Sequence, residues 1–97
     1  MMSKIPVDLE KLKGKLRDAE IARVGIIAEL DAISLYEQLA ALAESKLLRK
    51  VLLDIANEEK THVGEFLEML KRLDREQEKE LERGRDEVVE MGENSPE

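Results

Sequence analysis

Two long stretches of apolar residues at helical spacing, separated by only two polar residues, dominate this sequence of 97 residues. Spacings of three and four place the apolar side chains of each stretch on one face of an α-helix. The first helix is expected to begin at Pro6–Asp8 and to end near Ala43. The second is expected to follow the N-cap residue Ser45 and to end near Leu73. Because the connection at Glu44 is so short, the two helices are predicted to form an antiparallel hairpin.

The composition changes after Leu73 to alternating charge with few apolar residues. Leu81, Val88 and Val89 give this segment a thin apolar stripe, which predicts a shorter third helix that packs weakly or lies between subunits. Residues 92–97 are expected to be a flexible tail or the start of a linker, which leaves residues 1–91 as the helical domain. The predicted fold class is therefore all-α, a two-helix hairpin followed by a short C-terminal helix.

The composition also argues against several classes of function. The absence of cysteine excludes disulfides, thiolate zinc sites and iron–sulfur clusters, so His and carboxylates are the strong metal ligands available. A net charge of -7 and only two aromatic residues argue against a nucleic-acid partner. No apolar run approaches the roughly 20 residues of a membrane span, and no signal peptide is visible, so a cytoplasmic protein is expected. A domain this small gains core by forming oligomers.

Ionisable residues interrupt the apolar row of each predicted helix. The row on the first helix is Ala22, Ile26, Glu29, Ile33, Tyr36, Ala40 and Ala43. The row on the second helix is Leu52, Ile55, Glu59, His62, Phe66, Met69 and Leu73. Glu29 lies about 15 residues before the turn near residue 44, and Glu59 about 15 residues after it. Antiparallel packing therefore predicts that Glu29 and Glu59 lie at the same height along the hairpin.

This arrangement is typical of a metal site. A carboxylate buried without a partner costs several kcal/mol, and a bound metal ion removes that penalty. Glu59 and His62 are three residues apart, so both can reach one ion from the same helix face. Di-iron carboxylate bundles use one Glu from each of two helices and a Glu-x-x-His from each of the other two. One copy of this chain supplies half of that set, which predicts a homodimer that binds two irons and reacts with O₂.

Each of these residues also has a more ordinary interpretation. A lone His62 on an apolar face is more often a satisfied core histidine, and Glu29 could pair with a basic residue of another subunit. Tyr36, one heptad beyond Glu29, either assists the site by hydrogen bonding or electron donation or simply packs. The carboxylates that flank the rows are either secondary cation sites or a solvated face: Asp31, Glu37, Asp54, Glu58 and Glu65. A structural helical-hairpin adaptor, or a redox-silent zinc or calcium site, remains open.

Two sequence blocks, residues 28–36 and 57–62, resemble the encapsulated ferritins, which are ferritin-like proteins housed inside encapsulin nanocompartments. The residues that match the family pattern are Glu29, Tyr36, Glu58, Glu59 and His62. The resemblance covers roughly residues 20–75 and implies a ferroxidase whose di-iron site forms between two subunits. It implies Glu29, Glu59 and His62 as iron ligands, with Tyr36 beside them. It further implies dimers assembled into a ring, typically a decamer, that feed iron storage inside an encapsulin shell.

The chain departs from the family pattern at three places. Ala28 and Asp31 stand where many members have a second acidic pair for metal uptake, and Leu35 stands where many have Trp. The last residues lack the short peptide that docks free-standing members into the shell, so we expect either that this peptide was removed or that the chain is one domain of a longer polypeptide, fused to its shell protein. A rubrerythrin-like peroxidase is the nearest enzyme alternative, and the absence of the four cysteines of a rubredoxin domain disfavours it.

Overall fold

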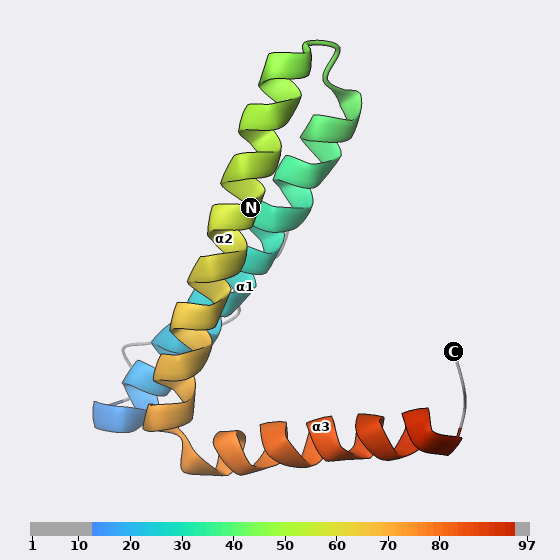
Figure 1. Cartoon of the computed structure of the whole chain (residues 1–97). Helices are drawn as coiled ribbons and strands as arrows, with labels where there is room; N and C mark the ends of the chain where they lie inside the picture. Colours follow the sequence, from blue (N-terminus) through green and yellow to red (C-terminus); the bar gives the residue numbers. More distant parts are fainter. Residues whose placement is uncertain (1–12, 95–97) are drawn as a thin grey trace.

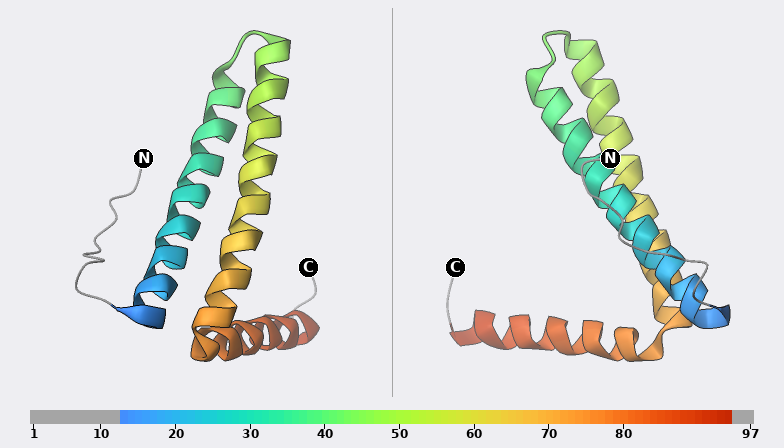
Figure 2. Two further views of the ribbon diagram at one scale, coloured as in Figure 1. Left: turned by 90° about the vertical axis from the view of Figure 1, so that its left-hand side faces the viewer. Right: turned by 180° about the vertical axis from the view of Figure 1, so that it is seen from behind.

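The computed structural model describes residues 13–94, and these residues form three α-helices and no strand. The helices are α1 (Gly14–Leu42), α2 (Lys46–Leu73) and α3 (Arg75–Asn94). Helices α1 and α2 lie side by side as an antiparallel hairpin, and α3 leaves sideways from the end opposite the tight turn (Figures 1 and 2). The predicted all-α class and the hairpin with a C-terminal helix are confirmed. Within the described part of the chain, no helix is long and apolar enough to cross a membrane.

Local hydrogen bonds close the turn between α1 and α2. The Ser45 hydroxyl accepts a hydrogen bond from the Leu48 amide at 3.1 Å, which is the N-cap expected from the sequence. The Arg49 guanidinium donates to the carbonyls of Ala40 at 3.2 Å and Ala43 at 2.7 Å. The Ala40 carbonyl also accepts a hydrogen bond from the Ala43 amide at 3.4 Å, and Arg49 adds a side-chain donor to this end of α1. The bounds predicted for α2 are confirmed at both ends.

The predicted start of α1 is wrong. Lys13 has an extended backbone (φ -137°, ψ 154°), and the helix begins only at Gly14, whose φ is +59°. A left-handed residue at this point separates α1 from the preceding residues, of which 1–12 lie outside the described part of the chain. At the other end, α3 continues to Asn94, beyond the expected start of the tail at residue 92. The domain boundary at residue 91 stays a prediction.

The interior of the hairpin is built mainly from small side chains. Its buried residues are Ala19, Ala22, Ala40, Ala56 and Leu70. Alanines let the two helices approach closely, but they bury little apolar area. Many large apolar side chains of α1 and α2 are left at least a third exposed within residues 13–94. An exposed apolar surface of this kind is typical of a subunit that packs against another chain.

The two helices are closely packed where Gly25 of α1 faces Phe66 of α2. A Cβ atom at position 25 would lie 2.8 Å from three carbons of the Phe66 ring. Gly64, on α2, has no atom within 4 Å of such a position. Only the first of these two helix-interior glycines is therefore required by packing.

We predict opposite effects of alanine at these two glycines. Gly64→Ala should raise the free energy of unfolding by about 0.5–1 kcal/mol, because alanine is the better helix former. Gly25→Ala gains the same backbone term but forces the Phe66 ring to move, which costs about 1–3 kcal/mol. Urea unfolding of the two variants beside the wild type measures the difference. Equal stabilisation by both substitutions would contradict the close packing of Gly25 on Phe66.

Candidate metal centre

Glu29 of α1 meets Glu59 and His62 of α2 halfway along the hairpin. One ligand atom from each of the three residues lies within 4.8 Å of the others. The Nδ1 atom of His62 is 3.3 Å from a Glu59 carboxylate oxygen and 3.5 Å from a Glu29 oxygen. The structure thus brings together the three residues that interrupt the apolar rows, at the matched height expected from counting along the hairpin.

The two carboxylates of this group are mostly buried and short of positive partners. The side chains of Glu29 and Glu59 are only 19% and 20% exposed, whereas that of His62 is 43% exposed. The Oε2 atom of Glu29 is buried and accepts no hydrogen bond. Within residues 13–94 neither carboxylate pairs with a Lys or Arg, and the neighbouring Lys60 pairs instead with Glu37 at 3.1 Å. Two carboxylates with a single imidazole leave room for a cation.

An open hollow of about 290 Å³ lies beside the three-residue group. It is lined by Glu29, His62, Glu65, Phe66 and Met69. Glu65 follows His62 by three residues and therefore extends the same side of α2 by one turn. Glu65 was one of the flanking carboxylates in the sequence, and the structure places it next to the three-residue group.

The other candidate residues lie outside the three-residue group. Asp31 is half-buried on α1, and Glu58 is exposed on α2, and neither has an oxygen within the 4.8 Å cluster. Tyr36 is half-buried on α1, seven residues beyond Glu29. A role of Tyr36 in catalysis, and of Asp31 and Glu58 as secondary metal ligands, stays a prediction.

Exposed apolar side chains lie on the same side of the hairpin as His62. On α2, residues 48, 51, 55, 62 and 69 recur at helical spacing on one face. On α1, the apolar row of residues 21, 25, 28, 32, 35 and 39 includes Gly25, which faces Phe66 beside the site. We call the exposed large side chains of these two rows the site face: Ile21, Leu35, Leu39, Leu48, Val51 and Met69. The metal-ligand candidates therefore open onto an apolar surface that one copy leaves uncovered.

The fold and the site together define a ferritin-like helical domain with a carboxylate–imidazole group. A solved structure of this class, the encapsulated ferritin domain from Pyrococcus furiosus, matches with a TM-score of 0.78 at 49% identity. The match covers 93% of this chain and 92% of that chain. The sequence model of the EncFtn-like family matches residues 4–84. The chain belongs to this family, which confirms the resemblance to encapsulated ferritins.

Two curated relatives share part of their length with this chain. The ferritin-like–encapsulin shell fusion protein of Pyrococcus furiosus is 58% identical over 72 residues, which are 74% of this chain and 21% of that protein. The encapsulin nanocompartment cargo protein EncC of Myxococcus xanthus is 38% identical over 66 residues. That match covers 65% of this chain and 51% of EncC. The chain thus spans about a fifth of the first relative and about half of the second.

Proposed function

We propose that this protein is a ferroxidase subunit that oxidises Fe(II) with O₂ at a di-iron centre shared by two copies. The observation that carries the proposal is the meeting of Glu29, Glu59 and His62 around one point on the apolar site face. Two such sets amount to four carboxylates and two imidazoles, which is the ligand set of di-iron carboxylate bundles. One chain holds only half of it.

The residues at the site suit iron. Hard carboxylate oxygens and a borderline imidazole nitrogen are the donors that Fe(II) accepts in oxygen-reacting sites. The buried Glu29 Oε2 atom, which accepts no hydrogen bond, is a lone acceptor that a cation would satisfy. Glu29 and Glu59 would bind the metal through their carboxylates, and neutral His62 through Nδ1, the nitrogen that faces them. As substrate, a pair of Fe(II) ions would supply two electrons, which with two protons would reduce one O₂ to hydrogen peroxide, and the ions would leave as Fe(III).

A second copy of the chain would bring the other half of the site. Packing two site faces together removes exposed apolar side chains from water and excludes water around the six ligands. Such a pair contributes four long helices, which completes a four-helix bundle from two hairpins. Tyr36, Asp31 and Glu58 would assist at its edges, Tyr36 by hydrogen bonding or electron donation and the two acids by attracting Fe(II). Further association of these dimers into a ring, typically a decamer, agrees with the family resemblance.

The names of the two relatives support a location for this activity inside an encapsulin shell. One relative is fused to an encapsulin shell, and the other is an encapsulin cargo protein. We infer that this chain also works inside an encapsulin nanocompartment, either as cargo or as a domain fused to the shell protein. The Fe(III) product would then be stored within the shell.

Iron binding tests this proposal without relying on turnover. Anaerobic addition of Fe(II), followed by native mass spectrometry, should give one iron per chain, with irons present in pairs on assemblies of even copy number. A chelator should remove the iron and lower the fraction of dimers, since four carboxylates without a cation repel each other. Glu59→Gln should lose the bound iron. An iron-free protein whose assembly is identical in chelator would instead indicate a structural hairpin, and tight zinc without oxidation a redox-silent site.

A further inference from the structure

Helices α2 and α3 are separated by a single residue, Asp74, yet they point in different directions (Figure 1). No glycine or proline lies between residues 65 and 83 to break a helix there. A second row of largely apolar residues on α2 continues in phase through α3. Its members at spacings of three and four are Phe66, Leu70, Leu73, Gln77, Leu81, Gly84, Val88 and Met91. Apart from a possible N-cap at Asp74, the local sequence is therefore compatible with one straight helix as well as with two helices at an angle.

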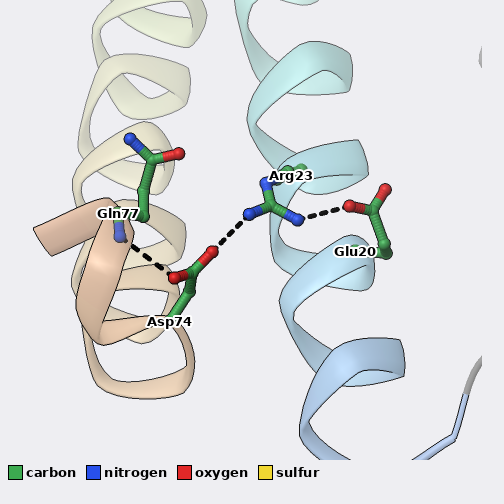
Figure 3. Close-up of polar contacts among 4 residues, drawn as sticks. All are labelled: Glu20, Arg23, Asp74 and Gln77. Carbon is green, nitrogen blue, oxygen red and sulfur yellow. Dashed lines mark hydrogen bonds and ion pairs between the residues drawn. The ribbon is translucent and has the colours of Figure 1, made fainter. Parts of the chain in front are cut away.

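The Asp74 side chain makes two contacts that favour the bend. One carboxylate oxygen accepts a hydrogen bond from the Gln77 amide at 3.0 Å, which makes Asp74 the N-cap of α3. The other oxygen pairs with the Arg23 guanidinium of α1 at 2.5 Å, and Arg23 also pairs with Glu20 on its own helix. Figure 3 shows Arg23 lying between Glu20 and Asp74, with Asp74 reaching the start of α3. A side chain of α1 thus holds the residue at which α3 begins.

Few other contacts hold α3 in place. Leu81 is half-buried and lines an apolar hollow with Ile26 and Ile27 of α1 and with Leu67 and Leu70 of α2. Every residue from 82 to 93 is exposed. The contacts that decide the direction of α3 are therefore confined to its first two turns.

We propose that the Arg23–Asp74 pair is a conformational latch that selects the bent arrangement of α2 and α3 over a single straight helix. In the straight form, Asp74 is an ordinary helix residue that caps nothing, and Leu81 leaves the hollow beside Ile27 and Leu67. Since α1 begins at the same end of the hairpin, α3 would then project past it as an extension of α2 (Figure 2). The latch therefore sets where α3 stands when copies of the chain meet.

A distance measurement between two spin labels distinguishes the two forms. The chain has no cysteine, so Lys50→Cys and Gly92→Cys introduce two unique labelling sites on exposed residues of α2 and α3. A straight helix would separate these positions by about 63 Å, at 1.5 Å per residue. In the bent form, the distance between the two labelled positions is shorter than this. Labelled chains are mixed with an excess of unlabelled chains before assembly, without added metal, so the result is independent of iron chemistry.

The latch predicts a graded response to substitution. Asp74→Ala removes both the cap and the ion pair and should raise the population near 63 Å about tenfold, whereas Arg23→Met removes only the pair and should raise it less. Arg23→Met also removes the pair of Arg23 with Glu20 within α1. The matched control is Arg72→Met, which likewise removes a pair within one helix, Arg72–Glu68 of α2, and should leave the distance unchanged. If Asp74→Ala fails to fold, Asp74→Asn retains a capping oxygen without the charge and should behave like Arg23→Met. Wild-type distances in the folded variants of Asp74 and Arg23 would overturn the proposal.

Discussion

Replacement of His62 by alanine is expected to lower the rate of Fe(II) oxidation in air about 100-fold or more, to the rate in protein-free buffer. Loss of groups that only support metal ligands already costs about 10–100-fold in affinity or activity, and loss of a ligand costs more. His62→Ala also leaves Glu29 and Glu59 facing each other without their imidazole partner, which weakens binding of either iron. Stopped-flow absorbance of the Fe(III) product measures the effect.

The adjacent Thr61 provides the matched control for this substitution. It lies on the same turn of α2, is exposed, and its hydroxyl donates only to the Asn57 carbonyl at 3.5 Å. Thr61→Ala should therefore oxidise Fe(II) at the wild-type rate. If His62→Ala and the wild type oxidise Fe(II) at equal rates, both faster than buffer, His62 is not part of the oxidation site.

Replacement of Leu35 by lysine is expected to prevent two copies from pairing. Leu35 lies on the site face, 39% exposed in one copy, and a lysine there would be buried in both halves of the dimer. Burying an unpaired charge costs several kcal/mol, so the dimer dissociation constant should rise about 100-fold or more. Sedimentation velocity over a range of protein concentrations measures this constant.

Leu53 provides the matched control, because Leu53→Lys introduces the same charge as Leu35→Lys on a different face of the hairpin. It lies on the opposite flank of α2, six residues before Glu59, and is 43% exposed. Leu53→Lys adds the same charge at a similar height of the hairpin but away from the site face, so the dimer should persist. Dissociation by both variants, or by neither, would argue against the site face as the dimer interface.

The hairpin and the register of the site could be predicted because local signals determine them. Ser45 caps α2, and a connection of three residues leaves antiparallel packing as the only short return path. Counting outward from the turn then places Glu29 opposite Glu59. The structure has the two carboxylates and His62 together, as that count requires.

Two features could not be predicted from local sequence patterns. The start of α1 depends on the left-handed backbone of Gly14, and a glycine inside a helical pattern does not by itself announce such a conformation. The direction of α3 depends on Arg23, which is 51 residues from Asp74 in the sequence. The spacing Asp74-x-x-Gln77 is a capping signal that could have indicated a helix start, although not its direction.

The flanking carboxylates mark the limit of reasoning from helix faces. Asp31, Glu58 and Glu65 all flank the rows, and their spacing alone does not separate them. The structure leaves Asp31 and Glu58 outside the three-residue group and lines the adjoining hollow with Glu65. This distinction depends on the direction of each side chain in the folded hairpin. The helical period places a residue on a face of the helix but does not fix where its carboxylate points.

The central claim is that one active site needs two copies of the chain. The most direct test is the rate of Fe(II) oxidation per chain, measured together with the association state over a dilution series of the wild type, Leu35→Lys and Leu53→Lys. The proposed function predicts that the rate per chain follows the fraction of chains in dimers, on one line for all three proteins. A monomer that oxidises Fe(II) as fast per chain as the dimer, or a dimer no faster than buffer, would contradict it.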